Sequence, residues 1–143
     1  MHVQIATLAD SASDYQGKLC VLGAFDMICA RQFPVVHPFC TLALRILFEP
    51  ADVGTHRFSI RCTDAAGAEV LKPLDLQPAM EIHFPSPFVP FITRNVVLNL
   101  QNLRFEKPGL IQWQLLCNQQ PLATIPLRVT QLEEGRGAHG PAG

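Results

Sequence analysis

Residues 93–129 alternate between apolar and polar side chains, and this pattern restricts the fold more than any other feature of the sequence. The alternation is interrupted only at the Pro108-Gly109 corner and at the corner of residues 118–121. A period of two residues indicates strands that bury one face and expose the other to water. Three such strands in succession predict an all-β protein.

The rest of the chain predicts further short strands, joined by turns rich in glycine, proline and aspartate. We expect strands at Val3–Ala9, Lys18–Asp26, Cys40–Phe48, Thr55–Cys62, Glu69–Leu71 and Met80–Phe84. The first should end in the polar stretch 10–14, and Met27–Arg31 fits either a short helical turn or a strand. Spacings of roughly 8–12 residues between strands favour a sandwich or barrel.

We therefore predict an antiparallel β-sandwich of general immunoglobulin-like architecture. The phase of the alternation identifies the side chains that should face its core together: Phe58, Ile60, Leu98, Leu100, Ile111, Trp113, Leu115 and Leu127. The chain has 143 residues, of which 48% are hydrophobic and 16% charged, a composition typical of a globular domain with its own core. We expect one domain over residues 1–131 and a flexible tail over 132–143, where little apolar surface is available to bury.

Charge and hydropathy argue against two classes of partner. A net charge of -1 does not provide the concentrated basic surface that nucleic-acid binding requires. No apolar run approaches the roughly 18 residues of a membrane-spanning helix, and residues 1–4 lack the basic start of a signal peptide. We expect neither nucleic acid nor membrane as a partner, and a cytoplasmic location.

The five cysteines support that location. Their number is odd and their spacing shows no pairs, which is unsuited to a disulfide framework. Cys62 and Cys117 share the phase of inward-facing neighbours, and Cys20 and Cys40 lie in strand-like runs, where a free cysteine behaves as a small hydrophobic residue. The sequence predicts a reduced chain.

A series of short motifs in the N-terminal third resembles a known family. The motifs are Leu8-Ala9-Asp10, Gly17-Lys18-Leu19, Leu22-Gly23-Ala24-Phe25-Asp26, Phe33-Pro34 and His37-Pro38. Together with residues 54–58 and 105–109 they are similar to a family of small uncharacterised bacterial proteins, over most of residues 3–129. The resemblance implies a β-rich single domain and a bacterial source, and it supplies no catalytic residue.

Cys29, His37 and Cys40 are the candidate residues for metal binding or for nucleophilic chemistry. A structural zinc site needs four ligands, usually in closely spaced pairs, and the remaining histidines are scattered. A nucleophilic Cys29 would need a depressed thiol pKa and a nearby base such as His37. We favour an inert thiol and a loop histidine, with no metal and no cofactor.

Arg45, Arg57 and Arg61 share the outward phase of their strands. They could form a basic stripe for an acidic ligand. Charged residues on the wet face of a sheet are ordinary, however, and nearby glutamates such as Glu69 can pair with them. We therefore favour a solvated face.

Two proline-rich connectors, Phe33–Phe39 and Phe84–Phe91, carry the functional prediction. So much apolar surface in a connector must be covered, either by the domain's own core or by another chain. We expect both connectors at the same end of the sandwich, with a contact surface formed by Phe33, Val36, His37, Phe39, Phe88, Val89 and Phe91.

The favoured function is a non-enzymatic protein-interaction or assembly module, with another protein or a second copy of the chain as partner. The alternative is a small-ligand-binding protein or enzyme with a pocket near Cys29 and His37. Phe88 and Phe91 clustered on an open surface would favour the module. A closed pocket around Cys29 and His37 would favour the alternative.

Overall fold

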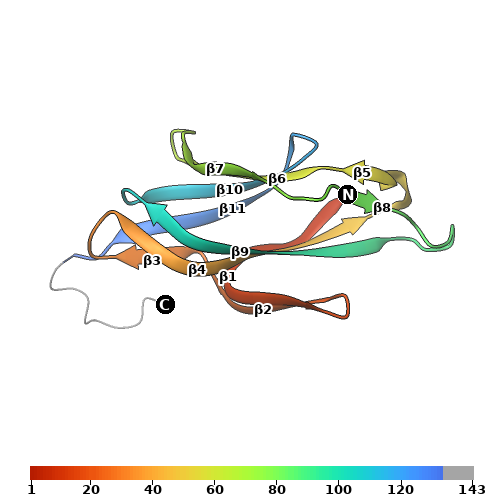
Figure 1. Cartoon of the computed structure of the whole chain (residues 1–143), viewed down its shortest axis with the longest axis horizontal. Coiled ribbons are helices and arrows are strands. Elements are labelled where there is room, and N and C mark those ends of the chain that lie inside the picture. Colours follow the sequence, from red (N-terminus) through yellow and green to blue (C-terminus); the bar gives the residue numbers. More distant parts are fainter. Residues whose placement is uncertain (134–143) are drawn as a thin grey trace.

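Two β-sheets form the body of the protein in a computed structural model that describes residues 1–133 (Figure 1). The first sheet has the strand order β2-β1-β4-β9 and the second β3-β11-β10-β6-β7, while β5 and β8 form a separate pair. The bounds are β1 His2–Tyr15, β2 Lys18–Phe25, β3 Met27–Ala30, β4 Val35–Phe48, β5 Gly54–His56, β6 Phe58–Asp64, β7 Glu69–Asp75, β8 Met80–Ile82, β9 Ile92–Phe105, β10 Gly109–Cys117 and β11 Gln120–Gln131.

The only helical segment in residues 1–133 is a single 3-10 turn, η1 at Pro50–Asp52. The prediction of an all-β protein is therefore confirmed. Neighbouring strands pair antiparallel, except that β3 runs parallel to β11. Within the same residues, no helix has the length and hydrophobicity that crossing a lipid bilayer requires.

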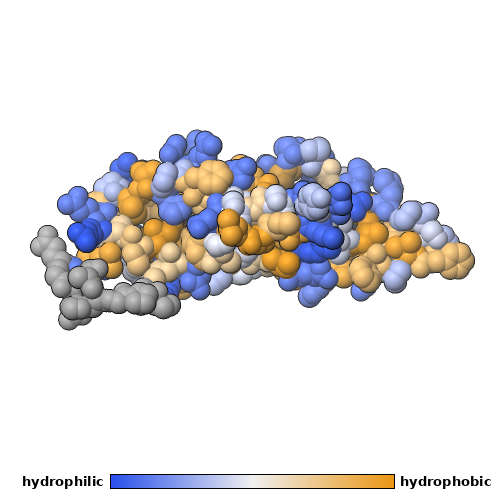
Figure 2. All heavy atoms as spheres, turned by 90° about the horizontal axis from the view of Figure 1, so that it is seen from below, coloured by the Kyte–Doolittle hydropathy of each residue, from blue (hydrophilic) through white to orange (hydrophobic). Residues whose placement is uncertain are grey.

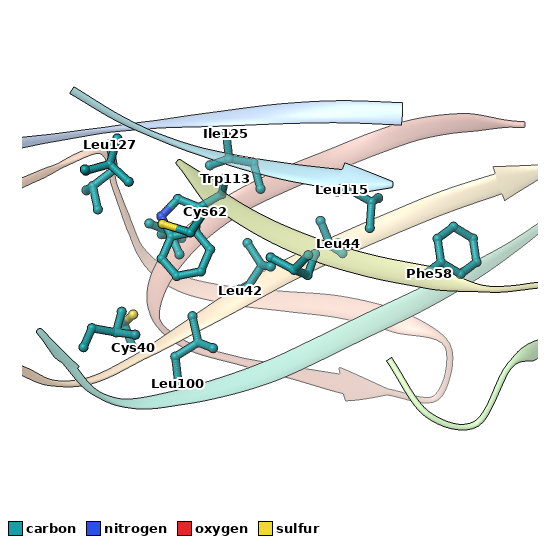
Figure 3. Close-up of a cluster of buried hydrophobic side chains, with 14 of the residues drawn as sticks. Cys40, Leu42, Leu44, Phe58, Cys62, Leu100, Trp113, Leu115, Ile125 and Leu127 are labelled. Atoms are coloured by element: carbon teal, nitrogen blue, oxygen red, sulfur yellow. The ribbon is translucent and has the colours of Figure 1, made fainter. Parts of the chain in front are cut away.

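Side chains from both large sheets meet in one hydrophobic cluster (Figure 3). Of the eight core residues predicted from the sequence, all but Leu98 are buried, and Leu98 packs half-buried against the cluster. Trp113 of β10 lies opposite Cys62 of β6 in the strand register, and both face the core. Period-two alternation thus identified the inward face of these strands correctly.

Both strands of the longest pair change phase near one end. In β9 the buried residues are Leu100 and then Leu103 and Phe105, so the odd positions turn inward after Asn102, whose φ is 54°. Residues 35–39 of β4 pair with this part of β9. The prediction that Phe33–Phe39 is a connector is therefore wrong for Val35–Phe39, which pairs as a strand despite Pro38.

The first strand folds back over the sheet to which it belongs. Residues 2–9 of β1 pair with β4, which places Ile5 beside Arg45. Residues 10–15 pair only with β2, and the turn after them brings the Gly17 carbonyl oxygen to 2.9 Å from Arg45 Nη1. The β1–β2 hairpin therefore covers the outer face of β4 (Figure 1), and Thr41 and Ala43 on that face are fully buried.

This hairpin corrects the prediction that the first strand ends at Ala9. Residues 10–14 are polar, but their backbone groups are paired with β2. The hairpin turn has positive φ at Gln16 and Gly17, and Asp14 Oδ1 accepts a hydrogen bond from the Gly17 amide at 3.0 Å. A hairpin with one exposed face can be polar along much of its length, so hydropathy alone places its end too early.

Three further predictions are refined by the structure. Met27–Arg31 contributes a strand, β3, although in the second sheet. The strand predicted at Thr55–Cys62 is divided at Arg57, whose amide and carbonyl both bond to Asn118 in the β10–β11 turn. Residue Leu132, predicted as the start of the tail, donates to the Ala30 carbonyl, and residues 134–143 of that tail lie outside the described residues.

Candidate functional site

The two proline-rich connectors lie at opposite ends of the β4–β9 pair. Val35 is paired with Phe105 at one end, and Phe48 with Ile92 at the other. Phe33–Phe39 opens β4 and Phe84–Phe91 leads into β9, so the 14-residue length of β4 separates them by roughly 40 Å. The prediction that they form one contact surface is wrong.

The Phe33–Phe39 segment belongs mainly to the core and to its edge. Phe33 and Val35 pack half-buried against the hydrophobic cluster. His37 is also half-buried, with its ring centroid 5.7 Å from that of Phe25. Only Val36 and Phe39 remain exposed as large apolar side chains. This segment caps one end of the sheets.

The Phe84–Phe91 loop divides its aromatic residues between core and solvent. Phe84 packs against the hydrophobic cluster, whereas Phe88 is 91% exposed and Phe91 50% exposed. A turn presents Phe88, because Ser86 accepts hydrogen bonds from the Phe88 amide at Oγ and from the Val89 amide at its carbonyl. Figure 2 shows apolar residues gathered at the end of the molecule where this loop lies in Figure 1.

An apolar groove runs along the side where the two sheets have free edges. β9 is the last strand of the first sheet and β7 the last strand of the second. Between them lies a groove of 590 Å³, whose walls include Leu74 and Leu76 on one side and Val96 and Leu98 on the other. The Phe84–Phe91 loop ends directly before β9, so the exposed loop and the groove lie on neighbouring parts of the chain.

A smaller cavity of 90 Å³ lies beside the groove, further along β9. Leu74 lines both hollows, and Trp113 and Leu100 line the smaller one. Trp113 is 3% exposed, and its indole Nε1 has no hydrogen-bond partner among the described residues. Buried polar groups are almost always paired, so this unpaired donor is an unusual feature of Trp113.

Asp75 is the one charged side chain among the residues that line the groove. It also lines an adjoining hollow of 390 Å³ together with Arg57. Lys72 lines the smaller cavity. Arg94 is exposed and lies two residues before Val96, which places it on the same face of β9.

Arg45, Arg57 and Arg61 do not form one surface. Arg45 belongs to the first sheet and holds the β1–β2 hairpin, while Arg57 and Arg61 belong to the region of β6. Arg61 Nη2 lies 3.7 Å from Glu69 Oε1, and both side chains are about half exposed. Such a pair contributes little to stability, and it supports the interpretation of a solvated face.

Cys29 and His37 are not brought together by any contact. Cys29 is exposed on β3, and its sulfur lies 3.1 Å from Thr130 Oγ1. His37 lies in the other sheet, against Phe25. Neither residue lines the hollows described above. Residues 1–133 contain no group of three or more histidine, cysteine, aspartate or glutamate side chains arranged to hold a metal ion.

A cysteine–histidine pair that the sequence did not indicate lies at the C-terminal end of β10, where Cys117 meets His56. His56 Nε2 is 2.6 Å from the Asp52 carbonyl oxygen, to which it must donate, so its Nδ1 is free to accept from Cys117 Sγ at 3.8 Å. Burial raises the pKa of the Cys117 thiol, with a further contribution from the Asp52 carboxylate. A nucleophile requires the opposite shift, so the pair is a packing contact.

Sequence comparison places the chain in a family. A family model described as "Family of unknown function (DUF6941)" matches residues 4–130, which is nearly all of the described chain, and the protein belongs to that family. No curated protein matches the chain.

Proposed function

We propose that this member of the DUF6941 family is a non-enzymatic module that binds another protein chain through the loop Phe84–Phe91. The observation that carries the proposal is the 91% exposure of Phe88. Burying such a side chain in a partner contributes about 1.5–3 kcal/mol. Aromatic residues that enter a partner's pocket are typical anchors of protein interfaces.

The construction of the loop supports a binding role. Phe84 fixes one end in the hydrophobic cluster, and Pro85, Pro87 and Pro90 restrict the backbone between its aromatic residues. A restrained loop loses less conformational entropy when it binds. The exposed Phe88 contributes little to the domain's own core. The stability of the monomer therefore does not explain why a large apolar side chain is found at this position.

The chemistry of the other candidate residues supports a non-enzymatic role. Burial raises the pKa of Cys40 to about 11 and that of Cys62 to about 12, and it raises that of Cys117 as well. These thiols are poor nucleophiles at neutral pH. One observation favours a second candidate function, a small-ligand-binding protein: the 590 Å³ groove falls within the size range of small-molecule sites.

The finer architecture and the cellular location are part of the proposal. Two sheets that share one hydrophobic cluster support an antiparallel β-sandwich of general immunoglobulin-like type. Five free cysteines support a reducing, cytoplasmic location, and we infer a bacterial source from the sequence motifs shared with the family.

The test compares Phe88→Ser with Leu22→Ser, which removes a 70% exposed apolar side chain from the β1–β2 hairpin. Wild-type and variant proteins are used as bait in extract of the native cell, and each is also examined alone by sedimentation. We expect a stoichiometric partner, or self-association, that is retained by Leu22→Ser and lost with Phe88→Ser, with both melting temperatures unchanged. Assembly that survives Phe88→Ser would contradict the proposal.

A further inference from the structure

We propose that the polar hollow at one end of the second sheet binds a small zwitterion, a molecule that carries both an ammonium and a carboxylate group, such as a free α-amino acid. The hollow has a volume of 390 Å³, which falls within the size range of small-molecule sites. No residue of the Phe84–Phe91 loop lines it. The inference therefore goes beyond the proposed function and does not rest on it.

The walls of the hollow come from three backbone segments that are joined to one another: the start of β6, the end of β7 and the β10–β11 turn. The Asn118 amide donates to the Arg57 carbonyl oxygen at 2.7 Å, and Asn118 Oδ1 accepts from the Arg57 amide at 3.0 Å. The Leu76 amide donates to the Phe58 carbonyl oxygen at 2.9 Å. The fold thus forms the hollow before any ligand binds, and this lowers the entropic cost of binding.

Two side chains of opposite charge, Arg57 and Asp75, line the hollow without pairing with each other. Neither side chain takes part in an ion pair within residues 1–133. Arg61 and Glu69, which lie further along β6 and β7, do pair, with 3.7 Å between Nη2 and Oε1. The charges of Arg57 and Asp75 are instead both available to a ligand that lies between them.

A zwitterion matches these two charges and the uncharged groups beside them. The Arg57 guanidinium can donate two parallel hydrogen bonds to a carboxylate, and the Asp75 carboxylate can accept from an ammonium group. Gln77 and Gln119 also line the hollow, and each has an amide that both donates and accepts hydrogen bonds. These amides favour an α-amino acid whose own side chain is polar.

The backbone at Gln119 has a conformation that favours glycine. The two-residue turn between β10 and β11 has φ values of 49° at Asn118 and 69° at Gln119. Asparagine is common in this left-handed region, whereas glycine is the residue usually found at the second position of such a turn. A turn with no other role would be less strained with glycine at position 119. A contact between the Gln119 side chain and a ligand in the hollow gives a reason for the strained residue.

The test uses the full-length protein and L-glutamine, with the backbone amides followed by NMR. We expect saturable shifts confined to residues 57–59, 75–77 and 118–119, with a Kd of about 1 mM or lower. Such a site would be nearly filled at about 10 mM ligand, so shifts that do not saturate by then overturn the inference. Equal shifts with D-glucose would assign the hollow to neutral polar ligands and would overturn it as well.

Two analogues of L-glutamine each lack one of its charges. N-acetyl-L-glutamine keeps the carboxylate but has no ammonium group, and L-glutaminamide keeps the ammonium group but has no carboxylate. We expect each to bind about tenfold more weakly than L-glutamine, equivalent to about 1.4 kcal/mol. An analogue that binds as well as L-glutamine would show that its missing charge is not recognised, and would overturn the assignment of a zwitterion.

Two substitutions assign each charge of the ligand to one residue. Asp75→Asn should remove the preference for L-glutamine over its N-acetyl analogue, and Arg57→Gln should remove the preference over L-glutaminamide. Both side chains are exposed, so we expect unchanged melting temperatures. Arg61→Gln and Glu69→Gln break the neighbouring ion pair and are the matched controls, which should bind as the wild type does. Preferences that survive both Asp75→Asn and Arg57→Gln would overturn the site.

Gln119→Gly separates binding from stability. We expect this variant to unfold at a higher urea concentration, because glycine relieves the strain of a positive φ, and to bind L-glutamine more weakly. A loss of binding in a more stable protein cannot result from unfolding. Undiminished binding by Gln119→Gly would overturn the inference that the ligand contacts this wall of the hollow.

Discussion

Arg45 Nη1 donates a hydrogen bond to the carbonyl oxygen of Gly17, 2.9 Å away, although 28 residues separate them in sequence. Asn95 joins the contact from β9, since its Nδ2 donates both to the same oxygen and to Asp14 Oδ2. Arg45 Nε also donates to Gln4. One guanidinium therefore connects β1, β4, β9 and the hairpin turn, and it holds the β1–β2 hairpin against the sheet.

Replacing Arg45 with alanine should release the tip of that hairpin. Three hydrogen bonds from a charged donor are lost, and we expect a cost of about 1–3 kcal/mol. Hydrogen exchange should accelerate in residues 10–25 more than in β10 or β11. Arg104→Ala, which removes an exposed pair with Glu106, is the control and should change little. Uniformly faster exchange would show that Arg45 supports the whole fold and not the hairpin alone.

Gly23 and Gly17 provide a matched pair within the same hairpin. Both have positive φ, of 71° and 80°, which an alanine adopts only with strain of about 1–2 kcal/mol. A Cβ at Gly23 would also lie 2.5 Å from Asp10 Oδ2, while one at Gly17 would meet nothing within 4 Å. Gly23→Ala should therefore destabilise the protein more than Gly17→Ala in urea unfolding. Equal losses would mean that Asp10 moves aside freely.

Leu115 tests the assignment of the core. Its side chain on β10 is fully buried, and Leu115→Ala should cost about 2–5 kcal/mol through lost burial and the cavity left behind. Leu110→Ala deletes the same atoms from a 43% exposed position on the same strand and should cost far less. The urea midpoints of both variants give the comparison, and similar midpoints would place Leu115 outside the core.

The strands with one solvent-exposed face were predictable because the alternation of apolar and polar residues lies within each strand. In β10 and β11 alternate side chains, from Ile111 to Cys117 and from Ile125 to Val129, are buried and those between them are more exposed, so burial follows local alternation. The strand at residues 35–39 was not predicted because Pro38 and the phase change at Asn102 break that regularity. The length of the first strand was not predicted because residues 10–14 owe their pairing to β2 and to the anchoring at Arg45, not to a hydrophobic face.

The candidate surfaces depended on topology, which local patterns do not contain. The sequence left open whether the phenylalanines of the Phe84–Phe91 loop are covered by the domain's own core or by another chain, and the structure buries Phe84 partly while it leaves Phe88 exposed. The two connectors could not be placed relative to each other without the register of β4 and β9. The groove was missed for a similar reason: Val96 looks like an ordinary strand residue, Leu74 lies beyond the strand predicted at Glu69–Leu71, and only the strand order shows that β7 and β9 are both edge strands.

Acid should weaken the contact between Asp52 and the N-terminal amine. Asp52 Oδ2 lies 2.8 Å from the Met1 nitrogen, and this hydrogen bond is the main reason that the Asp52 pKa is below 3.8, its ordinary value. A carboxylate whose folded pKa is lowered stabilises the protein fully above its unfolded pKa. That contribution is lost as the pH falls through the folded value.

We therefore expect Asp52→Asn to cost about 0.5–1 kcal/mol at pH 7, allowing for solvent screening of a surface pair. The difference from wild type should shrink below roughly pH 4. Urea unfolding of both proteins at neutral and acidic pH measures this directly. A difference that stays constant down to pH 2 would assign the effect of the substitution to packing around η1 and not to charge.

The five cysteines should divide into two classes toward a thiol reagent. Cys20 and Cys29 are exposed, whereas Cys40, Cys62 and Cys117 are buried. With a pKa of about 11, as for Cys40, only about one thiol in a thousand is ionised at pH 8 even before its burial limits access. In the native protein we expect two fast equivalents, removed one at a time by Cys20→Ser and Cys29→Ser. In denaturant without reductant all five should react, because the proposed cytoplasmic location requires free thiols. Fewer than five would reveal a disulfide and contradict that location.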